Sequence, residues 1–168
     1  MLDMYTSEHG IQKSFETINI KAFFDNLLKI NLTSQKCQFW LPTETHVINS
    51  NKIALTQIFT NLFSNAVKYN DKDNCIISVN VTENKSHYKF TVTDNGPGIE
   101  KSNYKEIFKL FKTASETDNR GKKGNGIGLS IVKKLVKKLN GEISVTSEFG
   151  KFTTFTFTVE KPTTLTIN

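Results

Sequence analysis

Several features that would assign a chain to a class are missing from this sequence of 168 residues. No run of 18 apolar residues occurs, which argues against a membrane-spanning helix. The first residues, MLDMYTSEHG, contain no basic stretch followed by an apolar one, as a secretory signal would. We therefore expect a soluble, cytoplasmic fragment that makes no membrane contact of its own, although it can be the cytoplasmic part of a membrane-bound protein.

Cysteine, histidine and arginine are scarce. The two cysteines, Cys37 and Cys75, have no CxxC spacing, and the three histidines are scattered, so no zinc pattern is present. We expect both cysteines to be buried and reduced. The formal charge of +6 comes almost entirely from lysine, because Arg120 is the single arginine. Without arginines or aromatic residues among the lysines, a solvated helix face is a better interpretation than a nucleic-acid site, so no nucleic-acid partner is expected.

What is present fits one globular domain, with 37% hydrophobic residues and 13 phenylalanines to fill a core. Apolar periodicity predicts helices over residues 20–32, 51–70, 104–111 and 129–139, with Asn19 and Ser50 as candidate caps. Alternation predicts strands over residues 37–41, 46–48, 75–82, 87–93, 142–147 and 151–160. The order predicts an α+β fold, a two-layer sandwich in which three helices cover one face of a mixed, mostly antiparallel sheet of about five strands.

The helix expected over residues 51–70 has an unusual margin. Asn61, Asn65 and Lys68 lie beside its apolar face, so that two amide oxygens and a cation could meet a metal-bound phosphate. For this helix alone, an ordinary amphipathic helix with polar edges is the better interpretation. The segments that follow this helix in the sequence favour a binding site instead.

Two glycine-rich segments follow. Gly124, Gly126 and Gly128 stand at the entry to a helix, where free backbone amides and the helix dipole favour an anion. The spacing is GxGxG after a polar loop, which differs from a Rossmann site, and no GxxxxGK followed by Ser or Thr is present, which excludes a P-loop. Asp94 ends a strand before Gly96 and Gly98, where its carboxylate could accept a hydrogen bond from an amino group such as that of adenine.

Four segments together resemble the catalytic ATP-binding domain of sensor histidine kinases, within the superfamily shared with gyrase and the heat-shock chaperone ATPases. They are NLFSNAVKY, DNGPGI, IFKLF and GNGIGL, in the order in which that family carries its asparagine box, first glycine box, phenylalanine box and second glycine box. The resemblance implies the Bergerat ATP-binding fold. It also implies a domain over residues 18–161, with residues 1–17 as a linker from the dimerisation helices and residues 162–168 as a tail.

By this resemblance ATP and Mg²⁺ are the cofactors. The residues expected to act on the phosphates are Asn61, Asn65 and Lys68, with Asn65 as the metal ligand. Tyr69 is expected to lie against the adenine or ribose, and Asp94 to accept a hydrogen bond from the adenine amino group. Gly96 and Gly98 are expected to let the nucleotide in, and Ile99 is a further expected nucleotide-binding residue. Thr153 or Thr154 is expected behind the adenine, with no choice between the two threonines. Phe108 and Phe111 are expected to anchor a lid, Lys112 to Lys123, that closes over ATP. The second glycine box contributes Gly124, Gly126, Ile127, Gly128 and Leu129.

The expected function is transfer of the γ-phosphate to a histidine on a separate dimerisation domain, with a response regulator receiver domain as an indirect partner. None of His9, His46 and His87 has the sequence context of a phosphoacceptor. The alternatives are an ATPase or serine protein kinase of the same superfamily, and a non-catalytic nucleotide-binding adaptor. Asn61 disfavours hydrolysis, because an ATPase would need a carboxylate there to activate water.

Overall fold

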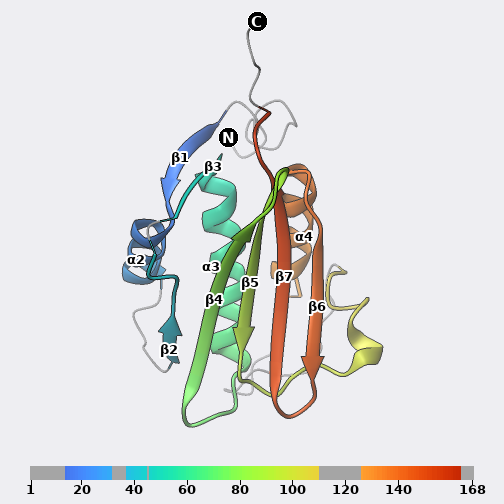
Figure 1. Ribbon diagram of the computed structural model, residues 1–168. Helices are drawn as coiled ribbons and strands as arrows, with labels where there is room; N and C mark the ends of the chain where they lie inside the picture. The colour runs from blue at the N-terminus through green and yellow to red at the C-terminus, as the bar shows by residue number, and fades with distance from the viewer. Residues whose placement is uncertain (1–13, 32–36, 45, 110–125, 164–168) are drawn as a thin grey trace, which may run out of the picture.

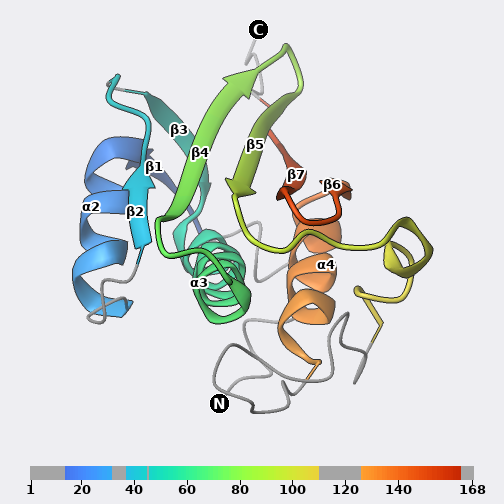
Figure 2. The ribbon, with the colours of Figure 1, turned by 90° about the horizontal axis from the view of Figure 1, so that it is seen from below.

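The computed structural model describes residues 14–31, 37–44, 46–109 and 126–163. Within these ranges a five-stranded sheet forms one layer, and three helices pack against one of its faces (Figures 1 and 2). The predicted α+β sandwich is therefore confirmed. None of the helices in these ranges has the length and apolar character needed to cross a membrane.

The sheet has the strand order β2-β4-β5-β7-β6. Its strands are β2 (Cys37–Trp40), β4 (Cys75–Glu83), β5 (His87–Asp94), β6 (Ile143–Glu148) and β7 (Phe152–Glu160). The β2–β4 pair is parallel and the other pairs are antiparallel. Short turns join β4 to β5 and β6 to β7, which makes these two pairs antiparallel hairpins. The helices are α2 (Ile20–Asn31), α3 (Lys52–Tyr69) and α4 (Gly128–Lys138).

A separate two-stranded sheet joins β1 (Phe15–Asn19) to β3 (Val47–Asn51) in antiparallel register. The sequence did not predict β1, because FETIN offers a single buried position, Ile18, which pairs with Ile48. This strand is defined by its partner rather than by its own pattern. The domain boundary expected between residues 17 and 18 lies inside β1.

The core lies between α3 and the inner face of the sheet. Alternation along β5 and β7 points Phe90, Val92, Phe155 and Phe157 toward the helices. Phe59 of α3 lies at the centre of this cluster. Its ring centroid is 5.5 Å from that of Phe90 and 5.4 Å from that of Phe157. Edge-to-face packing of fully buried rings fixes the rotation of α3, and with it the direction of the polar margin of this helix.

Two helix ends differ from expectation. The N-cap of α3 is Asn51 rather than Ser50, since the Asn51 side chain accepts a hydrogen bond of 2.8 Å from the Ala54 amide. After α4 the left-handed residue is Asn140, with φ of 52°, and not Gly141 as expected. A Cβ on Gly141 would lie 1.7 Å from the Thr158 carbonyl oxygen, so this glycine allows close approach to β7. The Asn19 cap of α2 is confirmed by a 3.0 Å bond from the Ala22 amide.

The helix predicted over residues 104–111 is wrong in the part that the structure describes. A short 3₁₀ helix, η2 (Lys101–Asn103), is followed by turns through residue 108. Ile107 is the single buried residue among residues 101–109, so this segment has no continuous apolar face to pack as a regular helix. Phe111 lies outside the described residues.

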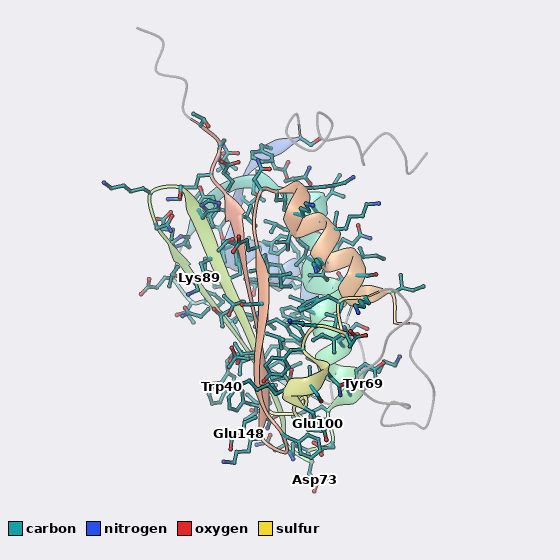
Figure 3. The ribbon with its side chains drawn as sticks, turned by 90° about the vertical axis from the view of Figure 1, so that its right-hand side faces the viewer. Trp40, Tyr69, Asp73, Lys89, Glu100 and Glu148 are labelled. Carbon is teal, nitrogen blue, oxygen red and sulfur yellow. A yellow bond between two sulfur atoms is a disulfide. The ribbon has the colours of Figure 1, made fainter. Side chains whose placement is uncertain are left out.

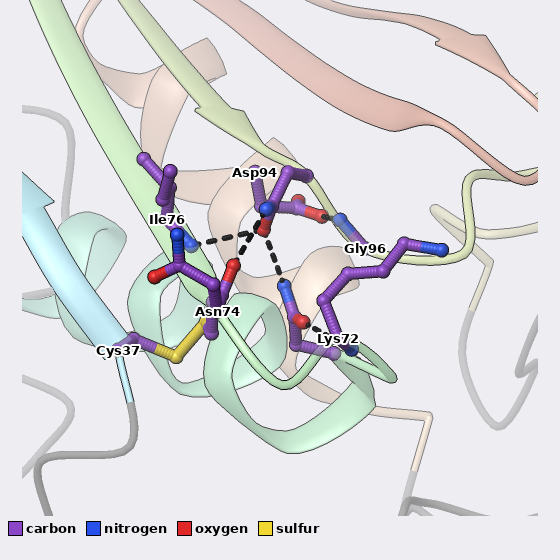
Figure 4. Close-up of a disulfide and its surroundings, with 9 residues drawn as sticks. Cys37, Lys72, Asn74, Ile76, Asp94 and Gly96 are labelled. Carbon is purple, nitrogen blue, oxygen red and sulfur yellow. Dashed lines mark hydrogen bonds between the residues drawn. A yellow bond between two sulfur atoms is a disulfide. The ribbon is translucent and has the colours of Figure 1, made fainter.

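The prediction of reduced cysteines is also wrong. Cys37 and Cys75 are buried as expected, but they form a disulfide (Figure 4). They are the first residues of β2 and β4 and stand opposite each other in the parallel register, with Cα atoms 4.4 Å apart. The two sulfur atoms are therefore within bonding distance of each other. Cytosolic proteins seldom keep structural disulfides, and the cytoplasmic location stays a prediction.

Candidate nucleotide site

A cavity of about 530 Å³ opens beside α3, at the end of the sheet where β5 stops. Its walls come from α3, the segment after β5, the start of α4 and the β6–β7 hairpin. Figure 3 shows Tyr69 of α3 and Glu100 of the segment after β5 at the same end of the molecule, and both residues line this cavity. Elements that are far apart in sequence thus converge on one concave surface, the usual form of a small-molecule site.

Asp94 forms one end of the cavity. It is the last residue of β5 and continues the inward alternation of Tyr88, Phe90 and Val92, so that a carboxylate takes a position with core-like burial. Burial raises the pKa of the Asp94 carboxyl to about 6, although the hydrogen bond from the Gly96 amide opposes this shift. That bond, 2.9 Å to Oδ1, fixes the orientation of the carboxylate. Among the described residues, the other oxygen, Oδ2, has no hydrogen-bond partner, and Asp94 lines the cavity.

Glycine is required in the loop after Asp94 for packing. A Cβ on Gly96 would lie 2.7 Å from Asp94 Oδ1, so a side chain there would displace the carboxylate. Gly98 has a positive φ of 72°, and a Cβ on it would lie 2.3 Å from the Glu148 carbonyl oxygen. Because neither residue has a Cβ, the loop can pack closely against the Asp94 side chain and against the turn between β6 and β7. Gly98 also lines the cavity, whereas Gly96 does not.

Asn95, between these groups, joins three segments. Its Oδ1 accepts hydrogen bonds from Asn70 Nδ2 (3.1 Å) and from the Ile76 amide (2.9 Å), and its Nδ2 donates to the Asn74 carbonyl (2.8 Å). Asn70 follows the last turn of α3, and Asn74 and Ile76 flank Cys75. Figure 4 shows this network beside the disulfide. The loop that carries Asp94 is thereby tied to the end of α3 and to the start of β4.

Ser147 of β6 ties the same loop to the far hairpin. Its Oγ accepts a 2.8 Å hydrogen bond from the Ile99 amide, and its backbone carbonyl accepts a 2.7 Å bond from the Tyr104 hydroxyl. The hydroxyl oxygens of Ser147 and Thr153 are 3.2 Å apart. Thr153 pairs with Asp94 across β5 and β7 and is buried. Hydrogen bonds at Asn95 on one side and at Ser147 on the other thus fix the loop that forms this end of the cavity.

The other end of the cavity is formed by the margin of α3 and the start of α4. Asn61 donates to the Gln57 carbonyl at 2.9 Å, and a Cβ on Gly128 would lie 3.0 Å from its Oδ1, so the two helices meet closely at this pair. Lys68 places its Nζ 5.1 Å from the centre of the Tyr69 ring. Among the described residues, no side-chain hydrogen bond is recorded for Asn65, which lines the cavity half-buried.

The structure brings most of the expected residues together. Those that line the cavity are Asn61, Asn65, Lys68, Tyr69, Asp94, Gly98, Ile99, Gly126, Ile127, Gly128, Leu129 and Thr153. Three described residues do not line it, namely Gly96, Phe108 and Thr154. The Phe108 ring packs 6.1 Å from Phe155, with Lys133 Nζ 5.9 Å from its centre. Phe111, Lys112 and Gly124 lie outside the described residues, as does the whole of the expected lid over residues 112–123.

The two threonines that the sequence left open are separated by the structure. Thr153 faces the cavity, while the Thr154 hydroxyl bonds that of Thr93 at 2.8 Å on the other face of the sheet. Alternation gave this signal already, because Phe155, Phe157 and Val159 share the parity of Thr153. Sequence reasoning did not place the following residues in the site: Ser64, Ala66, Pro97, Glu100, Asn103, Ile107, Phe149 and Phe155.

A second hollow, of about 610 Å³, lies along the first turns of α3 and is lined by that helix alone, from Lys52 to Asn61. It lacks the convergence of several elements, so the cavity at Asp94 is the better candidate site. The described residues hold no group of three or more His, Cys, Asp or Glu side chains that could bind a metal ion by itself.

The sequence profile of one family matches residues 50–163, which include α3, both glycine segments and the sheet from β4 onward. That family is described as histidine kinase-, DNA gyrase B- and HSP90-like ATPase. The chain belongs to this ATPase family. The chain therefore contains an ATP-binding domain, and the resemblance drawn from the four sequence segments is confirmed.

Curated relatives of this ATPase domain include signalling kinases. The chain is 34% identical over 126 residues to hybrid signal transduction histidine kinase B of Dictyostelium discoideum, covering 73% of this chain and 6% of that protein. It is 32% identical over 123 residues to sensor histidine kinase YcbM of Bacillus subtilis, covering 73% of this chain and 39% of that protein. The chain thus spans well under half the length of these relatives.

Solved structures share the fold. A mycobacterial sensor histidine kinase, MprB, superposes with a TM-score of 0.71 at 20% identity, over 87% of this chain and 97% of that chain. Full-length ShkA, solved in complex with AMPPNP, gives 0.72 at 22% identity, over 88% of this chain and 31% of that chain. At such identities the likeness concerns the arrangement of helices and strands.

Proposed function

We propose that this chain binds Mg-ATP in the cavity and donates the γ-phosphate to a histidine on a separate dimerisation domain of a longer sensor kinase. The observation that carries the proposal is the arrangement of polar groups in one cavity. A buried carboxylate, Asp94, forms one end, and the amide and cationic margin of α3 forms the other. The first suits an amino group of a base, and the second suits phosphates with a metal ion.

At the base end, Asp94 accepts a hydrogen bond from the adenine amino group. Thr153, beside it in the sheet register, backs the adenine through a water molecule, and Tyr69 lies against the adenine or the ribose. Thr154 does not have this role, because its hydroxyl bonds that of Thr93 on the opposite face of the sheet. Adenine is preferred over guanine, because a guanine carbonyl oxygen at the same place would face a carboxylate oxygen.

At the phosphate end, Asn65 holds Mg²⁺ through its amide oxygen, Asn61 supports it one turn earlier, and Lys68 contacts phosphate. One protein oxygen is enough, since Mg²⁺ usually keeps several waters and takes its remaining ligands from substrate phosphates. When bound, Mg²⁺ neutralises charge on the phosphates. The start of α4, with Gly126 and Gly128, offers backbone amides to the same groups.

Transfer breaks the bond between the γ-phosphorus and the bridging oxygen of ADP and forms a phosphorus–nitrogen bond on the acceptor imidazole. Phosphoryl transfer depends mainly on positioning and charge stabilisation, so this chain needs no nucleophile of its own. Asn61 bonds the Gln57 carbonyl and, as a neutral amide, cannot activate water. We therefore take the ATP-binding unit to begin at β1 rather than at residue 18 and to include β7, and the response regulator to be the later recipient of the phosphate.

The test mixes this chain with γ-labelled ATP, Mg²⁺ and a separately produced helical domain that carries the acceptor histidine. We expect acid-labile label on the helical domain, and none when its histidine is replaced or when this chain carries Asn65→Ala. Release of free phosphate at the same rate with and without the helical domain would instead identify an ATPase. Nucleotide binding without either reaction would favour the adaptor.

A further inference from the structure

Phe149 combines two properties that seldom occur together. It lies in the turn between β6 and β7, where 68% of its surface is exposed, and it also lines the cavity that holds Asp94. The other large exposed apolar residues in the described ranges, Trp40, Val47 and Ile53, do not line this cavity. Removing the surface of a phenylalanine ring from water is favourable, so an aromatic ring at the rim of a ligand site indicates an apolar partner in the ligand.

The backbone at Phe149 is held in place by the loop that carries Asp94. The Gly150 amide donates to the Pro97 carbonyl at 2.6 Å, and Lys72 Nζ donates to the Gly150 carbonyl at 3.2 Å. The missing side chain of Gly98 brings the two segments together, since a Cβ there would lie 2.9 Å from Phe149 Cα. The Phe149 ring therefore extends from a turn whose position is fixed relative to Asp94, the proposed acceptor for the base.

The occupant of the site, on the proposed function, has a flat apolar face at this end. A purine base held by Asp94 turns its edge to the carboxylate and presents its faces to the walls of the cavity. Pro97 and Gly98 of the Asp94 loop line the cavity next to the turn that carries Phe149. An aromatic ring at that position can cover a face of the base without a hydrogen bond.

We propose that Phe149 is a base-stacking residue of this site and covers one face of the nucleotide base. This inference rests on the proposed ATP site and adds a contact that the four sequence segments do not contain. Stacking is indifferent to the phosphates, so the contact contributes equally to ATP, ADP and adenosine. It contributes nothing to inorganic tripolyphosphate.

The experiment measures dissociation constants by calorimetry for Phe149→Ala, Phe149→Tyr and wild type, with ATP, adenosine and tripolyphosphate as the probes. We expect Phe149→Ala to weaken ATP and adenosine by the same factor, about tenfold, as removal of a stacked ring does in other base-binding sites. Phe149→Tyr should restore both affinities. Tripolyphosphate binding should not change. Trp40→Ala removes an exposed aromatic residue that does not line the cavity and serves as the matched control.

A fluorescence measurement gives a second readout. In a Trp40→Phe background, Phe149→Trp supplies the only tryptophan, since the sequence has one. Adenosine should quench or shift its emission, and tripolyphosphate should not. Unchanged adenosine affinity in Phe149→Ala, or an emission unaffected by adenosine, would overturn the stacking role while the wild-type chain still binds ATP. Failure of the wild-type chain to bind ATP would instead refute the proposed function.

Discussion

The two ends of the cavity are built in different ways. The base end, around Asp94, is made of strand ends and a loop whose polar groups already bond one another, through Gly96, Asn95 and Ser147. The phosphate end is made of side chains on the margin of one helix. For Asn65 the described residues supply no side-chain partner, and Lys68 rests on the neighbouring Tyr69 ring.

This difference indicates how the site divides its work. A fixed acceptor at the base end costs little conformational entropy on binding and so favours recognition of one base. Side chains that keep their polar atoms available suit a charged group whose ions and waters change during transfer. Changes at the base end should affect ligands with or without phosphates, and changes at the phosphate end should affect only ligands that carry them.

The largest expected effect concerns the strand pair under the base end. The Cys37–Cys75 disulfide closes a loop of 38 residues, which in the chain-entropy model stabilises the fold by about 4 kcal/mol. Urea titrations with and without a dithiol reductant should differ by roughly that free energy of unfolding. The double variant Cys37→Ala/Cys75→Ala should show no effect of the reductant. Two free thiols in the native, unreduced chain would contradict the disulfide.

The next effect separates the two ends. Asp94→Asn turns a hydrogen-bond acceptor into a group that can present an amide donor to the adenine amino group. We expect affinity for ATP and for adenosine to fall equally, by about a hundredfold, or roughly 3 kcal/mol. Calorimetry measures both constants. The free energy of unfolding should not fall, because the substitution removes a buried charge. A loss confined to ATP would mean that Asp94 acts on the phosphates.

Asn65→Ala is the complementary change at the phosphate end. Removing the proposed metal ligand should weaken Mg-ATP by at least about tenfold, in the range seen when metal-site residues are replaced. Adenosine binding and stability should be unaltered. Gln57→Ala, on the exposed side of α3 and outside this cavity, is the matched control. Equal losses for adenosine and Mg-ATP would remove the distinction between the two ends.

The smallest effect depends on pH. Because the folded-state pKa of Asp94 is raised to about 6 from 3.8, the ionised carboxylate opposes folding above pH 6. That penalty is relieved as pH falls toward 4, so the contribution of Asp94 to stability rises on acidification. Adenosine affinity should fall by about tenfold between pH 7 and pH 5, as the acceptor becomes protonated. Asp94→Asn should show no such dependence. Adenosine is the ligand of choice because it carries no titrating phosphate.

Much of the fold could be predicted because its signals are periodic. Alternation in KFTTFTFTVE and the apolar arc of α3 each specify one buried face, and the ends of these elements fell within one or two residues of expectation. The four segments in order identified the family. Asn61, Asn65, Asp94 and Thr153 were all candidates from sequence, and the cavity brings them together.

The rest depended on partners that a local pattern does not name. Nothing in FETIN predicts β1, because the strand is stabilised by its pairing with β3. Phe149 lies in a turn, and nothing in the sequence around it points to a ligand site. It becomes part of the site because the distant loop with Pro97 and Gly98 packs against that turn. Residues 104–108 carry apolar residues at helical spacing, yet they form turns in which the Tyr104 hydroxyl bonds the Ser147 carbonyl.

The sequence by itself determined the elements, their buried faces and the family, since each of these is written in spacing along the chain. Tertiary structure decided which strands became neighbours. Cys37 and Cys75 each start a predicted strand, but only the parallel pairing of β2 with β4 puts their sulfur atoms within bonding distance. The same holds for Asp94 and the margin of α3. They face one cavity because the phenylalanine core fixes the rotation of the helix over the sheet.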